Sequence, residues 1–166
     1  MYEPREDSYM LESAVHAYAY GSVLDMGTGT GIQGIAAAMK GCDVTFSDLD
    51  KRALECAKGN AAANGVHGRF VLSDMFDDID GSFDTIIFNP PYLVGTSNDI
   101  ALDGGENGRR CIDGFIESYR DHVNDKHKVL LLESSFNMYE KDVKRLGATV
   151  VAKEHYFFED IVVLLF

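Results

Sequence analysis

Short apolar runs and apolar residues at helical spacing alternate along this chain. The apolar runs that end in polar residues or glycine predict strands over 22–26, 43–47, 69–72, 83–88 and 128–133. Apolar residues at helical spacing predict helices over 6–20, 32–40, 51–64, 112–123 and 137–146. Two final apolar runs, 148–154 and 160–166, lie too close together for a crossover helix, so we expect an antiparallel hairpin. The pattern predicts an α/β fold, a doubly wound, mostly parallel seven-stranded sheet with an antiparallel edge.

Length and composition indicate one globular domain over 1–166. A chain of 166 residues with 46% hydrophobic and 25% charged residues can bury a core but is short for two ordinary domains. No stretch approaches the roughly 18 uninterrupted apolar residues of a membrane span. The polar, charged start is unlike a signal peptide, and three cysteines without CxxC spacing favour free thiols. We therefore expect a cytoplasmic protein.

The charge argues against one class of partner. The formal net charge is −12 and the pI is about 4.7. Lys and Arg normally supply most of the affinity for a nucleic-acid duplex, and an acidic surface repels phosphates. A protein or small-molecule substrate therefore fits better than nucleic acid, although many of the acids could simply solvate the surface.

A glycine-rich loop follows the first predicted strand. Gly29, Gly31 and Gly34 satisfy GxGxxG, and Asp48 follows at about the distance expected of a dinucleotide site, so NAD binding stays open. Gly27 and Asp25 extend the run to Asp-x-Gly-x-Gly-x-Gly.

The extended pattern resembles the first motif of class I S-adenosylmethionine-dependent methyltransferases. The resemblance implies that the backbone of Gly27, Thr28, Gly29 and Gly31 lies against the amino-acid part of S-adenosyl-L-methionine. Asp25 would orient the same part of the cofactor.

Two further acids follow the second and third strands. Asp48, followed by Leu49, is placed to bind ribose hydroxyls, because a carboxylate accepts two hydrogen bonds. Asp74, beside Met75, stands where this superfamily binds the adenine amino group against an apolar wall. A single acid at a strand end is as often a helix cap or a turn residue, but three acids after three successive strands favour a cofactor site. We interpret Asp77, Asp78 and Asp80 as turn residues.

The fourth predicted strand ends at Asn89-Pro90-Pro91-Tyr92, which resembles the fourth motif of methyltransferases that modify a planar nitrogen in adenine or glutamine. The Asn89 side-chain oxygen and the Pro90 carbonyl could each accept one N–H group of an NH₂, which turns the lone pair of that nitrogen toward the donor methyl. We also count Asn89 among the residues that contact the cofactor. Tyr92 could pack on the planar group and exclude water. The alternative is a tight turn that caps the strand. We assign no role or metal to the scattered histidines His16, His67, His122, His127 and His155.

Two segments outside these motifs narrow the family. Residues 2–8 resemble the opening of eukaryotic and archaeal HemK-like methyltransferases, which modify the glutamine in the Gly-Gly-Gln loop of class 1 release factors. Residues 102–109 resemble that family's Gly-Gly-x-x-Gly loop. The resemblance implies a protein-glutamine N5-methyltransferase with sheet order 3-2-1-4-5-7-6 and a substrate-side loop over 93–110. Glu6 and Asp7, in an N-terminal helical segment over 1–20, would close over the cofactor, although both could simply form the acidic first turn of a helix.

The bacterial relatives carry a separate N-terminal domain, whereas about 20 residues precede the first strand here. By resemblance, a small zinc-binding activator protein would assist substrate binding. The predicted edge strand Arg69–Leu72 lacks Pro and Lys, so another chain could add a strand there. Burial of Phe70 and Leu72 under helices is the alternative. Arg109 and Arg110 are candidates for a protein-facing or cofactor-lid contact.

Two other functions stay open at this point. The same motif occurs in nucleic-acid amino-methyltransferases that act on adenine or guanine. A glycine loop of this kind also occurs in non-catalytic nucleotide-binding proteins and in NAD-dependent oxidoreductases.

Overall fold

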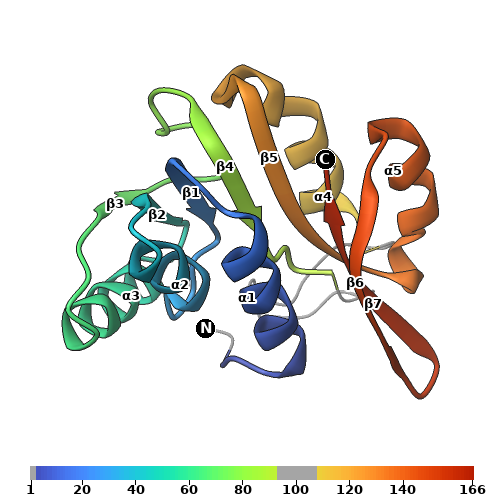
Figure 1. Ribbon diagram of the computed structural model, residues 1–166, viewed down its shortest axis with the longest axis horizontal. Helices are drawn as coiled ribbons and strands as arrows, with labels where there is room; N and C mark the ends of the chain where they lie inside the picture. The colour runs from blue at the N-terminus through green and yellow to red at the C-terminus, as the bar shows by residue number, and fades with distance from the viewer. Residues whose placement is uncertain (1–2, 93–107) are drawn as a thin grey trace.

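The computed structural model describes residues 3–92 and 108–166, and the strands in this part of the chain form one seven-stranded sheet (Figure 1). The strand order is β3-β2-β1-β4-β5-β7-β6, as predicted. Strands β1 to β5 are parallel, and β7 is antiparallel to both β5 and β6. The strands are β1 Ser22–Met26, β2 Asp43–Asp48, β3 Arg69–Leu72, β4 Phe83–Phe88, β5 Val123–Ser134, β6 Thr149–Tyr156 and β7 Glu159–Leu165.

Helices cover both faces of the sheet. Helices α1, α2 and α3 lie on one face, and α4 and α5 lie on the other (Figure 1). Their bounds are α1 Glu6–Tyr18, α2 Ile32–Met39, α3 Lys51–Ala63, α4 Arg110–Ser118 and α5 Tyr139–Leu146, with short 3-10 turns η1 Tyr119–His122 and η2 Ser135–Asn137. None of these helices is long and apolar enough to cross a membrane.

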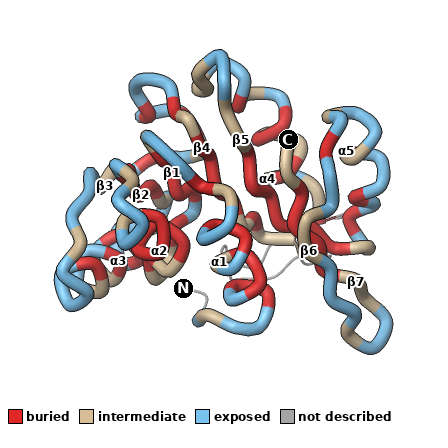
Figure 2. The backbone as a smooth tube through the Cα atoms, in the orientation of Figure 1, coloured by how far each residue is buried: buried red, intermediate tan, exposed pale blue. Residues whose placement is uncertain are grey.

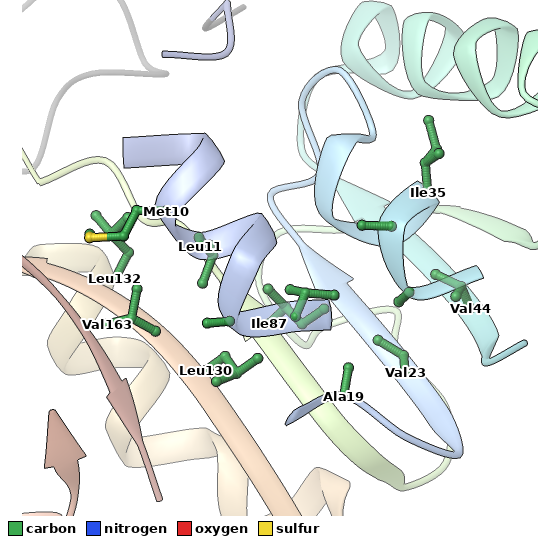
Figure 3. Close-up of a cluster of buried hydrophobic side chains, with 14 of the residues drawn as sticks. Met10, Leu11, Ala19, Val23, Ile35, Val44, Ile87, Leu130, Leu132 and Val163 are labelled. Atoms are coloured by element: carbon green, nitrogen blue, oxygen red, sulfur yellow. The ribbon is translucent and has the colours of Figure 1, made fainter. Parts of the chain in front are cut away.

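The central strands are buried on both faces, which explains their continuous apolar sequence. In β5, Leu130 and Leu132 join the core under α1 and α2, while Val129 and Leu131 join the core under α4. Figure 3 shows the first core, in which Leu11 of α1 packs toward the strands. The exposed residues lie mainly on the outer helix faces and loop tips (Figure 2).

The structure differs from the prediction in the region between β3 and α5. Strand β5 begins at Val123 instead of residue 128, because Val123 pairs with Phe83 before the register shifts and Lys128 pairs with Thr85. The polar residues inside this bulge gave no strand signal. Helix α4 begins at Arg110 and ends at Ser118, where the chain tightens into the 3-10 turn η1 and brings His122 against Phe76.

A loop connects β3 to β4 and covers the sheet in place of a helix. Phe76 and Ile79 from this loop are buried, and the Phe76 ring lies 5.7 Å from that of Phe115 in α4. The neighbouring acids Asp77, Asp78 and Asp80 are exposed, as expected of turn residues. Cys42, Cys56 and Cys111 are free thiols.

Two glycines in helices provide a matched test of this packing. A Cβ atom at Gly34 of α2 would lie 2.3 Å from the Phe46 ring of β2 and 2.9 Å from Asp25 Oδ2, whereas one at Gly59 of α3 would meet no atom within 4 Å. We predict that Gly34→Ala lowers the free energy of unfolding by about 1–3 kcal/mol, as overpacking does. Gly59→Ala should raise it by about 0.5–1 kcal/mol through helix propensity. Urea denaturation of both variants checks this, and equal effects would contradict the close approach of α2 to the sheet.

Candidate active site

A cavity of about 810 Å³ opens at the carboxyl ends of β1, β2, β3 and β4. The loops after these strands, the start of α1 and the start of α4 line it. Strand order reverses between β1 and β4, and ligands of doubly wound sheets bind at such a switch point. The volume lies within the usual range for small-molecule sites.

Asp25 is buried beneath the glycine loop and holds it in place. Its side chain is 2% exposed, and Oδ2 accepts hydrogen bonds from Thr28 Oγ1 at 2.5 Å and from the Gly34 backbone N–H at 2.8 Å. Burial raises the pKa of Asp25 to about 7, despite the opposing effect of these two hydrogen bonds. One carboxyl group thus joins the loop to the first turn of α2.

Asp48 holds the other side of the same loop. Its Oδ2 accepts a hydrogen bond from the Gly29 backbone N–H at 2.9 Å, and its Oδ1 accepts one from the Asp50 N–H at 2.8 Å. Each oxygen therefore retains a second lone pair for a ligand hydroxyl. Leu49, next along the chain, lines the cavity while 52% exposed.

A turn after β3 presents Asp74 and Met75 at the cavity. Ser73 Oγ donates to the Met75 carbonyl at 3.0 Å and accepts from the Asp78 N–H at 3.0 Å. Met75 has a φ of +49°, an uncommon conformation for a residue with a long side chain. The exposed Asp74 carboxylate forms no hydrogen bond with a described side chain or backbone group, so it is available to a ligand.

The Asn89-Pro90-Pro91-Tyr92 segment lines the cavity and is held in place at Tyr92. Tyr92 Oη donates to Asp7 Oδ2 at 3.0 Å, and the Tyr92 carbonyl accepts from Asn137 Nδ2 at 2.9 Å. The Asn89 side chain forms no hydrogen bond with the rest of the described chain. A free amide thus lies on a backbone that its neighbours hold in place.

Asn137 is a supporting residue that the sequence did not reveal. It is fully buried, and Nδ2 also donates to the Gly108 carbonyl at 3.0 Å while Oδ1 accepts from the Ser134 N–H at 3.1 Å. Gly108 has a φ of +64°, and a Cβ atom there would lie 2.4 Å from the Tyr92 carbonyl oxygen. Asn137 therefore joins Tyr92 to Gly108, the two residues that flank 93–107.

The structure corrects the prediction for Arg109. Its side chain is only 12% exposed, and the guanidinium group forms ion pairs with Asp113 at 2.6 Å and Asp142 at 2.7 Å and donates to the Asn137 carbonyl at 2.5 Å. Arg109 is thus a structural residue under the site instead of a protein-facing or lid contact. Arg110 does line the cavity.

Most of the predicted site residues meet at this one cavity. Those in its lining are Asp7, Asp25, Gly27, Thr28, Gly29, Asp48, Leu49, Asp74, Met75, Asn89, Pro90 and Tyr92. Gly31 lies outside the lining as the N-cap of α2, close to Ala57, and Glu6 is exposed at the start of α1. Tyr2 and the predicted loop residues 93–107, with Gly104 and Gly105, lie outside the described residues.

Sequence reasoning missed several lining residues, including Ser8, Gln33 and Cys111. Gln33 Nε2 donates to the Ser8 carbonyl at 2.9 Å, so their joint position depends on how α1 packs against α2. No local motif signals such a contact.

Comparison with known proteins places the whole arrangement in a family. The model of the "Methyltransferase small domain" family matches residues 6–146. A candidate protein N5-glutamine methyltransferase of Methanocaldococcus jannaschii is 35% identical over 154 residues, which cover 88% of this chain and 78% of that protein. Ribosomal RNA small subunit methyltransferase C of Serratia proteamaculans is 31% identical over 157 residues, covering 83% of this chain and 44% of that protein. The chain thus spans less than half of the latter.

Solved structures show the same fold. A chain of the Mtq2-Trm112 complex of E. cuniculi, described as responsible for methylation of the eRF1 translation termination factor, has a TM-score of 0.80 and 29% identity. The match covers 99% of this chain and 96% of that chain. A ribosomal protein L11 methylase of Lactobacillus delbrueckii has a TM-score of 0.73 at 20% identity, covering 98% of this chain and 79% of that chain.

The buried carboxyl group of Asp25 predicts a pH-dependent stability. The pKa of Asp25 is about 7 in the folded protein and about 4 in the unfolded chain, so the folded state binds the proton more tightly. The associated stabilisation is complete below about pH 4, is lost as the pH rises to 7, and does not change further above that. Each pKa unit corresponds to about 1.4 kcal/mol, so relative to wild type Asp25→Asn should gain on the order of 4 kcal/mol in unfolding free energy between pH 4 and 8.

Urea denaturation across this pH range measures the effect. Asp77→Asn, in the exposed loop after β3, controls for the loss of one acidic group. A constant difference between Asp25→Asn and wild type at every pH would contradict the proposed proton uptake by Asp25.

Proposed function

Because the chain belongs to the methyltransferase small domain family, we propose that it methylates a planar side-chain amide with S-adenosyl-L-methionine as donor. The proposed substrate is the glutamine in the Gly-Gly-Gln loop of a class 1 peptide chain release factor. The observation that carries this proposal is the position of Asn89: its side chain forms no hydrogen bond among the described residues, it lines a cavity of cofactor size, and its backbone is fixed through Tyr92. The similarity to the M. jannaschii protein supports the choice of a glutamine, and the similarity to the E. cuniculi protein supports the choice of a translation termination factor.

The cavity lining suits the chemical groups of this cofactor. Asp25 and the backbone of the glycine loop would face the cationic amino-acid part, and Asp48 would accept hydrogen bonds from the ribose hydroxyls. Asp74 would accept from the adenine amino group beside Leu49 and Met75. When bound, S-adenosyl-L-methionine supplies an electrophilic methyl group on a sulfonium.

The residues of the chain would then position a weak nucleophile. An amide nitrogen has a delocalised lone pair, so its orientation and environment limit the reaction. Asn89 Oδ1 and the Pro90 carbonyl would each accept one N–H, turning the lone pair toward the donor methyl. Tyr92, held by Asp7, would pack on the amide plane and exclude water. The amide nitrogen would form its bond to the methyl carbon while the bond from that carbon to the sulfonium sulfur breaks, and S-adenosyl-L-homocysteine would leave as a neutral thioether. The methylated nitrogen would then lose one proton, which would pass to solvent as the product leaves, so the step needs no strong base.

The similarity to a ribosomal RNA methyltransferase supplies a second candidate, methylation of an exocyclic amine in RNA. The same two acceptors would hold such an amine. The net charge of −12 disfavours it, because the phosphates would be repelled.

We also propose that a small zinc-binding activator protein binds at the edge strand β3. The E. cuniculi neighbour was solved as a complex of two proteins, which supports a partner for this chain. β3 is the outer strand of the sheet, and Leu72 is 52% exposed. Phe70 is half-buried and stacks on Phe46 with ring centroids 4.7 Å apart. The stacking of Phe70 thus fixes the edge strand to the sheet, and the exposed Leu72 is available to a partner that adds a strand.

Methyl transfer from labelled S-adenosyl-L-methionine tests the proposed reaction. We expect label on the glutamine of a class 1 release factor, and none on DNA or RNA, in assays with and without the activator. Asn89→Ala should lower the transfer rate at least about 100-fold, because its proposed partner is the substrate nitrogen. Its cofactor dissociation constant should stay within about threefold of wild type.

The exposed Asn64 at the end of α3 provides the control, since Asn64→Ala removes the same group far from the cavity. Label on nucleic acid alone would overturn the glutamine assignment. A collapse of cofactor affinity in Asn89→Ala would show that Asn89 binds the cofactor instead of the substrate.

The partner site has its own test. Leu72→Glu should weaken binding of the activator at least about tenfold, because it places a charge on the apolar edge while leaving the core intact. Met39→Glu, at a 65% exposed position in α2, is the matched control. Calorimetric titration measures both affinities, and equal affinities would exclude β3 as the binding edge.

A further inference from the structure

The β6–β7 hairpin extends beyond the carboxyl edge of the sheet. Pairing between β5 and β7 stops at Ser134 and Ile161, while pairing between β6 and β7 continues to Tyr156 and Glu159. The hairpin therefore projects past β5 (Figure 1, lower right). Its tip stands on the same edge of the sheet at which the cavity opens.

Two aromatic residues form the tip and are almost fully exposed. Phe157 and Phe158 are 93% and 90% exposed. Phe157 also has a φ of +48°, a conformation that glycine and asparagine adopt at lower cost. Folding alone would favour a small polar residue here, so the aromatic pair requires an explanation outside the fold.

The hairpin is connected to the cavity through α1, whose residues Asp7 and Ser8 line it. Helix α1 contacts both β6 and β7. Tyr156 of β6 packs against the core cluster that includes Met10 and Leu11 of α1. A hydrogen bond to Glu154, together with burial and the negative charges of Glu154, Glu6 and Asp7, raises the pKa of Tyr156 to about 12. Asp7 in turn holds Tyr92.

A second exposed apolar pair flanks Asn137 in the turn after β5. Phe136 is 55% exposed and Met138 is 40% exposed, and between them Asn137 donates to the Tyr92 carbonyl. This turn is fastened to the hairpin, because Ser135 Oγ accepts from the Asp160 N–H at 3.0 Å and Ser134 Oγ donates to Glu159 at 2.5 Å. We call the four side chains Phe136, Met138, Phe157 and Phe158 the hairpin surface.

The charges around this surface limit the kinds of partner that can bind it. The exposed or half-buried acids near the aromatic tip are Glu6, Glu154, Glu159 and Asp160. The hairpin also carries Lys153 and His155, but both pair with Asp160, so the remaining charge is acidic. With a net charge of −12, a second copy of the chain and a nucleic acid would both be repelled. A segment with apolar and basic side chains would be attracted.

We propose that the hairpin surface binds an apolar and basic segment of the substrate protein, outside the loop that enters the active site. This inference rests on the proposed function, since it names where the methylated protein is gripped. The cavity would bind the target side chain, and the hairpin would supply affinity for the rest of the protein. Loss of the hairpin contact should therefore raise KM for the whole substrate protein, whereas kcat should depend on the active-site residues.

The double variant Phe157→Asn/Phe158→Ser tests the proposal. Asparagine suits the left-handed conformation at 157, so thermal stability should be equal to or slightly above wild type. We expect KM for the whole release factor to rise at least about tenfold with kcat nearly unchanged. Activity on a short peptide containing only the target loop should match wild type.

Two further variants complete the design. Phe136→Ser should raise KM in the same way, while Met39→Ser, at an exposed position on α2, should leave it unchanged. Unchanged KM in both hairpin-surface variants would overturn the proposal, as would equal losses on peptide and whole protein. If wild type itself fails to methylate the release factor, the proposed function is wrong, an outcome that differs from unchanged KM in an active enzyme.

Discussion

A carboxyl group buried beneath a loop of glycines is the constraint on which the site depends. Asp25 is 2% exposed, and burial of such a group is costly unless donors surround it. Thr28 and the Gly34 N–H supply them, so the loop must fold over Asp25 and α2 must approach closely. The absence of a side chain at Gly34 makes that approach possible, and Asp48 then fixes the outer side of the loop. The shape of the cavity follows from these few bonds.

Local sequence predicts the parts of the site that are built from contiguous residues. The glycine loop, the acids at strand ends and Asn89-Pro90-Pro91-Tyr92 each combine a strand with the turn that ends it, and the sheet order brings them together. The strand order and the terminal hairpin were predicted correctly as well. Parallel strands that are buried on both faces have an apolar pattern that is hard to mistake.

The residues that the sequence did not reveal depend on contacts between distant elements. Asn137 joins Tyr92 to Gly108 across 45 and 29 positions, and its neighbours give no sign of this role. Arg109 shows the opposite error, because an arginine near a glycine-rich loop suggests a ligand contact, while three buried or half-buried partners hold it inside the protein. The start of β5 was missed because a polar bulge interrupts its apolar pattern.

Asn137 also couples the chain after β4 to the start of α4. Its one amide group donates to the carbonyls of both Tyr92 and Gly108, and it does not itself line the cavity. Loss of this amide would therefore release the end of the Asn89-Pro90-Pro91-Tyr92 segment and the chain before α4 together. The position of the site thus depends on a buried residue that no ligand in the cavity would touch.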